Sequence, residues 1–294
     1  MSAAATTPDA AEPQVLAKGS PLRVRPLGLS LGAWAALVIL GLVLLVAAFG
    51  PLLAPHDPNA INLSQQFYRP TGSHPLGQDA TGRDLLSRLL VGARTAVVGP
   101  LLVVVLSTIL GTAIALVSVW VGGWLDALTS RIIDAIFAFP GLLLAILATS
   151  LFGVGLKAAV IALAIAYTPY IARIVRSAAL RERNLPYVSA LQVQGLRAFT
   201  ICVKHLLPNV GTLIVANATL SFGFALIDLA GLSFIGLGVQ APTADWGAMV
   251  GAGVSGLMQG FPEESLYASV LIVLTVGAAN YLGDKLVERA EARR

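Results

Sequence analysis

Charged side chains are scarce in this 294-residue chain: only 12% of its residues are Asp, Glu, Lys or Arg, whereas 56% are hydrophobic. Soluble proteins usually carry about 25% charged and roughly 45–50% apolar residues. The mean hydropathy of +0.82 agrees with this difference, so the composition excludes a soluble domain. The net charge of +4 is small. Basic residues in so apolar a chain are better read as signals of membrane orientation than of nucleic-acid binding.

Cysteine and the residues of catalytic sites are equally sparse. The single cysteine, Cys202, excludes a disulfide within the chain. The three histidines, His56, His74 and His205, are too scattered in the sequence to predict a metal-ligand set or a nucleophile–histidine pair. No Gly-x-x-x-x-Gly-Lys-Ser/Thr loop is present, so the chain lacks that means of holding ATP. We therefore expect no catalytic, metal or cofactor site, and predict that the chain is not an enzyme by itself.

Long apolar runs, by contrast, are abundant. Five stretches contain no Asp, Glu, Lys or Arg at all: 27–55, 95–125, 135–156, 206–227 and 265–283. About 20 apolar residues in a helix cross a hydrocarbon core of roughly 30 Å. The sequence therefore predicts an all-α membrane protein with six transmembrane helices, near 30–52, 94–121, 131–152, 157–177, 209–238 and 264–285. The fifth carries Asp228 and several glycines, which leaves a bend or a break open there.

The basic residues predict the orientation of these spans. With six spans, fourteen Lys and Arg residues lie on the side that holds both termini, and five lie on the other. Basic residues are enriched on the cytoplasmic side, so both termini are predicted to be cytoplasmic. The chain then divides into a disordered N-terminal tail (1–26), a first span with an extracytoplasmic segment (27–93), a transmembrane core (94–287) and a cytoplasmic tail (288–294).

The extracytoplasmic segment reads HPLGQDATGRD over residues 74–84 and continues with leucines at positions 85, 86, 89 and 90. The helical spacing of these leucines predicts a short amphipathic helix at the membrane surface, before the second span begins. We interpret the segment either as an ordered loop with a surface helix or as a lip that meets a delivering protein.

The cytoplasmic segment 178–208 has a pattern of its own. It predicts a helix over 187–194 that stops at Gly195, and a second helix over 196–206 that is closed by Pro208. We interpret it as a docking element, with a solvated loop as the alternative. A solvated loop would need neither the glycine break nor the apolar residues of the first helix, Tyr187, Val188, Leu191 and Val193.

Polar residues within or beside the spans are candidates for a transport pathway. They include Asp134, Asn217, Asp228 and Asn280. A carboxylate within a span is costly, so it usually faces a cavity or a partner group. We therefore assign Asp228, Asn217 and the hydroxyl of Tyr167 to a candidate translocation pathway, with hydrogen bonding between helices or subunits as the alternative.

The stretch 187–209 resembles the coupling signature of ABC importer permeases. That signature reads Glu-Ala-Ala, three residues, Gly, nine residues, Ile, any residue, Leu-Pro. Four residues match it at the same spacing: Ala190, Gly195, Leu207 and Pro208. Three depart from it: Ser189, Leu191 and His205 stand at the positions of the Glu, the second Ala and the Ile. Three features resemble the dipeptide, oligopeptide and nickel branch of these permeases: His205 and the stretches 74–94 and 232–249. The HPLG segment resembles that of the C-type permease subunit of this branch.

The resemblance implies a type I ABC importer permease in the cell inner (plasma) membrane. Such a subunit pairs with a homologous second permease and two P-loop ATPases that bind ATP and Mg, receives substrate from an extracytoplasmic binding protein, contacts lipid and needs no nucleic acid. The ATPase-coupling residues it implies are Tyr187, Val188, Ser189, Ala190, Leu191, Gly195, His205, Leu207 and Pro208. The residues expected to contact the binding protein are Gln78, Asp79, Arg83, Asp84 and Trp246.

Several functions stay open within and beyond this resemblance. Di- or oligopeptides are the expected substrates because no cluster of His or Met lies in the predicted spans, and nickel is the alternative. Two alternatives come from other functional classes. One is an ion-coupled secondary transporter that uses Asp228, and the other is a membrane scaffold without transport.

Overall fold

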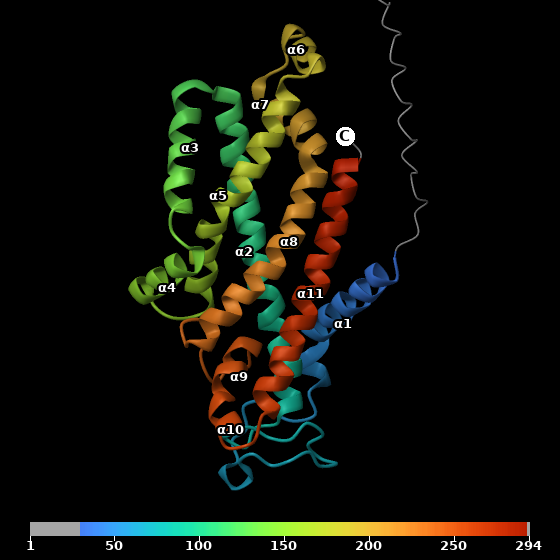
Figure 1. Cartoon of the computed structure of the whole chain (residues 1–294), viewed down its shortest axis with the longest axis vertical. Helices are drawn as coiled ribbons and strands as arrows, with labels where there is room; N and C mark the ends of the chain where they lie inside the picture. Colours follow the sequence, from blue (N-terminus) through green and yellow to red (C-terminus); the bar gives the residue numbers. More distant parts are fainter. Residues whose placement is uncertain (1–29, 293–294) are drawn as a thin grey trace, which may run out of the picture.

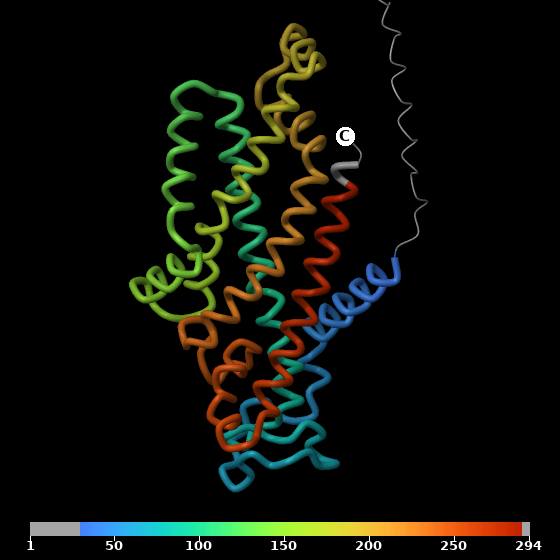
Figure 2. Tube along the Cα trace, in the orientation of Figure 1, coloured from blue at the N-terminus to red at the C-terminus, as the bar shows by residue number. Residues whose placement is uncertain are grey.

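The computed structural model describes residues 30–292, and within that range it contains helices and loops but no strand. The disordered tail predicted over 1–26 lies outside the described residues. Four long helices run roughly along the molecule (Figure 1): α2 (Leu85–Val121), α5 (Leu156–Arg183), α8 (Leu207–Phe234) and α11 (Glu263–Ala292). The helix α1 (Leu31–Leu53) packs against α2 and α11 and leans away from the bundle at its N-terminal end (Figure 2). The prediction of an all-helical membrane fold is confirmed.

Five helices of the described chain are long and apolar enough to cross a membrane, and a sixth span exists only as a bent pair. This pair, α3 (Gly123–Phe137) and α4 (Gly141–Phe152), changes direction by 84°. The single uninterrupted helix predicted over 131–152 is therefore wrong. The break falls at Pro140, which has no backbone N–H to continue the hydrogen-bond ladder and disfavours helical geometry in the residue before it.

The surface helix predicted over positions 85–90 is also wrong, because these residues form the first turns of α2. The Asp84 side chain accepts a hydrogen bond from the Ser87 backbone N–H at 2.8 Å and so starts the helix. Leu85 and Leu89 are only 1% and 5% exposed, and they pack into the core rather than lie on the membrane surface. A helix of 37 residues is about 55 Å long, so α2 extends well beyond the hydrocarbon thickness.

Small residues allow the long helices to approach each other closely. A Cβ added at Gly111 of α2 would lie 2.9 Å from backbone atoms of Thr168 and Ala172 in α5. Close packing through small residues is the usual way in which transmembrane helices associate. The fifth span, for which the sequence left a bend or a break open, has no break between Leu207 and Phe234, because these residues form the single helix α8.

The two polar segments singled out in the sequence lie at opposite ends of this bundle (Figure 1). One end carries the loop 54–84 together with α9 (Trp246–Ala252) and α10 (Val254–Met258). The other end carries α6 (Pro186–Val193) and α7 (Ala198–Ile201). We refer to these as the 54–84 segment and the 182–209 segment, the latter counted from the end of α5 to the start of α8.

Candidate functional site: the 182–209 and 54–84 segments

The 182–209 segment contains the predicted helix, glycine turn and helix. Gly195 has φ +80°, and the chain around it forms a Schellman motif. The Leu196 N–H donates to the Leu191 carbonyl at 3.2 Å, and the Gly195 N–H donates to the Gln192 carbonyl at 2.9 Å. A residue with a Cβ is strained at this φ, so glycine fixes the direction in which α6 leaves the second helix.

The sequence predicted that Pro208 closes the second helix, and this prediction is wrong. It begins with α7, passes through a π-helical turn (Cys202–Leu206) and continues directly into α8. The Leu207 N–H donates to the Cys202 carbonyl, five residues back. This wider turn lets the helix continue through Pro208, which has no N–H to donate. The 182–209 segment is therefore continuous with a long helix of the bundle.

The apolar residues of α6 do not all face outward. Val188 is 1% exposed and packs with Ile201 and Leu206 in a cluster of the chain's own residues. By contrast, Val193 is 89% exposed and Phe199, on the other side of the glycine turn, is 78% exposed. Phe199 is not among the residues predicted from the sequence, because it lies in a gap of the coupling signature. The other assigned residues divide between exposed (Ser189, Ala190, Gly195, Pro208) and half-buried (Tyr187, Leu191, His205, Leu207).

A hydrogen-bonded triad attaches α6 to two long helices. Tyr187 donates to the Glu182 carboxylate at 2.7 Å, and the Asn209 amide donates to Glu182 at 2.6 Å and to the Tyr187 oxygen at 3.1 Å. Burial, together with the bond to Glu182, raises the pKa of Tyr187 to about 12, so its hydroxyl stays a donor at neutral pH. Glu182 closes α5 and Asn209 opens α8. The triad therefore couples the start of α6 to both helices, and the sequence analysis had not assigned Glu182 or Asn209.

The three residues assigned to a translocation pathway lie between α5 and α8. Tyr167 donates to Asp228 at 2.9 Å, and Tyr170 donates to Asn217 at 3.3 Å. Both pairs join α5 to α8, which is the helix-to-helix bonding that the sequence left as the alternative. Asp134 lies elsewhere, paired with Arg173.

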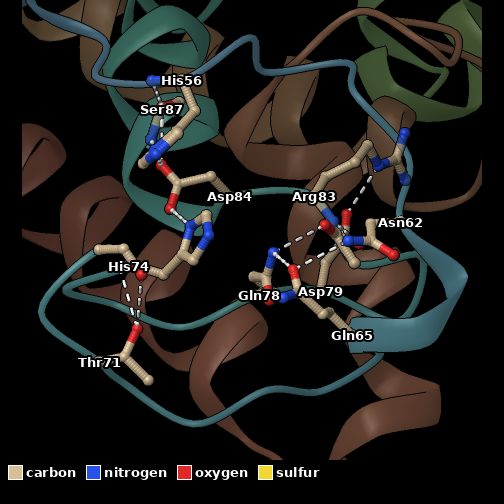
Figure 3. Close-up of polar contacts among 12 residues, drawn as sticks. His56, Asn62, Gln65, Thr71, His74, Gln78, Asp79, Arg83, Asp84 and Ser87 are labelled. Carbon is tan, nitrogen blue, oxygen red and sulfur yellow. Dashed lines mark hydrogen bonds and ion pairs between the residues drawn. The ribbon is translucent and has the colours of Figure 1, made fainter.

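The 54–84 segment is folded around buried polar groups (Figure 3). The Asp79 carboxylate is 2% exposed and accepts hydrogen bonds from the backbone N–H groups of Thr81 and Arg83, from the Thr81 hydroxyl and from the Arg83 guanidinium, at 2.7–3.0 Å. Burial alone would raise the pKa of Asp79, but these bonds and the Arg83 charge outweigh it and leave the pKa below its ordinary value. Gln78 closes the same turn by donating to the Gly82 carbonyl at 3.0 Å. These groups hold the HPLGQDATGRD stretch in one conformation.

Four of the five residues expected to contact a binding protein are buried in this conformation. Gln78, Asp79, Asp84 and Trp246 are at most 6% exposed, and the indole N–H of Trp246 donates to the Leu89 carbonyl at 2.9 Å. They cannot form a contact surface here, and only Arg83 is partly accessible. The exposed apolar side chains of the segment are instead Ile61, Leu63 and Tyr68, which the sequence analysis did not select.

The histidines are less scattered than the sequence suggested. His56 and His74 lie with ring centroids 4.5 Å apart and the rings tilted by 31°, beside the Asp84 carboxylate (Figure 3). Their separation of 18 positions in the sequence concealed this contact. His205 lies at the opposite end of the molecule, as predicted.

Comparison with known proteins gives consistent matches over nearly all of the described chain. Residues 95–294 match the family described as binding-protein-dependent transport system inner membrane component. Residues 31–70 match the N-terminal TM domain of oligopeptide transport permease C.

Individual relatives extend over most of the chain. It is 36% identical to the dipeptide transport system permease protein DppC of Alkalihalophilus pseudofirmus, over 85% of this chain and 82% of the relative. The same identity holds with the probable D,D-dipeptide transport system permease protein DdpC of Escherichia coli K12, over 91% and 86%. It also holds with the glutathione transport system permease protein GsiD of Pectobacterium atrosepticum, over 83% and 81%. The fold is similar to that of the methionine ABC transporter MetNI in an inward-facing conformation, with a TM-score of 0.56 and 20% identity over 69% of this chain and 96% of the other.

Proposed function

The chain belongs to the family of binding-protein-dependent transport system inner membrane components, and from this premise we propose that it imports di- or oligopeptides as one of two permease subunits driven by partner ATPases. As a member of that family it is a multi-pass inner-membrane ABC transporter permease. The relatives named for dipeptides and glutathione, itself a small peptide, support the peptide class of substrate. We further propose that the end carrying the 182–209 segment, like both termini, is cytoplasmic.

The observation that carries this proposal is the attachment of the 182–209 segment to the bundle. A partner that displaces α6 would act on α5 and α8 together, because the Glu182–Tyr187–Asn209 triad joins all three helices. Those two helices also carry the Tyr167–Asp228 and Tyr170–Asn217 pairs. Motion of the 182–209 segment would thus reach the residues proposed to line the pathway.

The docking surface has an apolar component suited to a protein partner. Val193 and Phe199 flank the glycine turn and are the most exposed large apolar side chains of α6 and α7. Exposed apolar residues grouped within a polar surface are typical of interaction sites. We propose that they fill a groove of an ATPase subunit, with the exposed Ser189 and Ala190 beside them. ATP and Mg act on that partner, because this chain has no P-loop of its own.

Purification in mild detergent tests the proposed assembly. The wild-type chain should bring down a homologous second permease and P-loop ATPases. Val193→Asp should release the ATPases while keeping the second permease, because it places a charge in the proposed apolar contact. Leu63→Asp is the matched control, since Leu63 is 66% exposed at the opposite end, and it should retain both. Purification of the chain alone, or equal ATPase recovery with both variants, would contradict the proposal.

A further inference from the structure

Three potential metal ligands converge in the 54–84 segment, although they come from different parts of it. His56 follows the end of α1, His74 lies in the following loop, and Asp84 caps the start of α2. One ligand atom of each lies within 4.8 Å of the other two. Figure 3 shows both imidazoles turned toward the Asp84 carboxylate.

The distances suit coordination of a small divalent ion. His74 Nδ1 lies 2.9 Å from Asp84 Oδ1, and His56 Nδ1 lies 3.7 Å from Asp84 Oδ2. Ligand atoms bound to one zinc ion at about 2.0–2.2 Å each lie about 3–3.5 Å apart. The His74–Asp84 pair, hydrogen-bonded at 2.9 Å, is close to this spacing, whereas the more exposed His56 ring must move closer to complete the set.

The charge of Asp84 gives an independent reason to expect a cation. Its side chain is 1% exposed, and among the described residues its only ion-pair partners are the two histidines. A buried carboxylate is usually paired with a cation or bound to a metal, and a bound metal ion would compensate the Asp84 charge. The Ser87 N–H and hydroxyl both bond to Oδ2, at 2.8 and 2.6 Å, and so orient the carboxylate while leaving Oδ1 to His74.

Access to the cluster is open on the histidine side. The side chains of His56 and His74 are 39% and 19% exposed, so an ion can enter from solvent and keep a water ligand. Two imidazoles with one carboxylate suit zinc and related divalent transition metals rather than Mg²⁺ or Ca²⁺, which prefer oxygen ligands alone.

We propose that His56, His74 and Asp84 bind one divalent transition-metal ion of the zinc class. The ion would join the end of α1, the 54–84 segment and the start of α2 at a single point, independently of what the permease transports. This proposal departs from our expectation that the chain has no metal site.

Zinc titration of the full chain, purified without a polyhistidine tag, tests this assignment. Competition with a chromogenic chelator should show one Zn²⁺ bound per chain. His56→Ala and His74→Ala should each weaken binding at least about tenfold, since even changes to groups that only orient a ligand cost about 10–100-fold. His205→Ala is the matched control and should bind Zn²⁺ as the wild type does.

A second measurement separates lost ligands from lost folding. Zn²⁺ should raise the melting temperature of the wild type and of His205→Ala, but not that of His56→Ala. The His56 backbone N–H, which donates to the Ser87 hydroxyl at 3.1 Å, stays in place in that variant. Absence of Zn²⁺ binding by the wild type, or equal binding by all the variants, would show that the cluster is only a hydrogen-bonded support.

Discussion

Replacing Gly195 with valine should uncouple ATP hydrolysis from uptake. Gly195 has φ +80°, and no heavy atom lies within 4 Å of the position its Cβ would occupy. The Cβ of valine would therefore meet no neighbour, so the main effect would come from the backbone conformation. The left-handed conformation costs an L-residue roughly 1–2 kcal/mol. A penalty of that size changes the ratio of two conformations by about 5–30-fold.

The assay is the amount of labelled dipeptide taken up per ATP hydrolysed, measured in proteoliposomes that hold the whole transporter. For Gly195→Val we expect this ratio to fall about 5–30-fold while the chain still inserts and assembles, because the angle between α6 and the following helix shifts. Gly260→Val is the matched control: Gly260 also has a positive φ, +85°, in open space and the same pattern of backbone hydrogen bonds, but it follows α10 at the opposite end of the molecule. Unchanged coupling in Gly195→Val, or an equal loss in Gly260→Val, would refute the reasoning.

Three further outcomes are expected. The lowered pKa of Asp79 means that its stabilising contribution is present above about pH 4 and is lost as the pH falls through the folded-state pKa. Asp79→Asn should therefore lower the free energy of unfolding at pH 7 by about 1.5–3 kcal/mol, and this free energy should then decrease less as the pH is lowered. Asp57→Asn, at an exposed position, should cause neither change. Denaturation at several pH values measures both effects. In a chain whose one native cysteine is replaced by serine, a membrane-impermeant thiol reagent added outside intact cells should label Ser73→Cys but not Gln192→Cys, both exposed positions; the reverse pattern would invert the proposed topology. Trp246→Phe should lower the melting temperature, because it removes a buried indole hydrogen bond worth about 1 kcal/mol, and an unchanged value would show that this bond contributes nothing.

The positions of the spans could be predicted because length and apolarity decide them, but the breaks within them could not. Pro100 and Pro169 lie inside the unbroken helices α2 and α5, whereas Pro140 separates α3 from α4. A proline kinks or ends a helix according to whether neighbouring groups satisfy the carbonyls it frees. That depends on packing, which an apolar sequence does not reveal. The same reason hid the π-helical turn before Pro208.

Some parts of the candidate site could likewise be predicted from the sequence, and others could not. The turn at Gly195 could be predicted, because a glycine after a short helix is a local signal. The burial of Asp79 and the meeting of His56 with His74 could not, since both depend on how the 54–84 segment closes on itself. Polar residues in a loop are usually exposed, whereas Asp79 is buried. The triad that attaches α6 was likewise hidden, because Glu182 and Asn209 are 27 residues apart.

ATP-driven uptake by the purified assembly tests the central claim most directly. Proteoliposomes that contain this chain, a second permease, two ATPases and the binding protein should accumulate labelled dipeptide only when ATP is supplied to the side that carries the ATPases. Vesicles with this chain alone should accumulate none, even with an ion gradient across the membrane. Uptake by the chain alone, driven by that gradient, would contradict the account and identify an ion-coupled transporter instead.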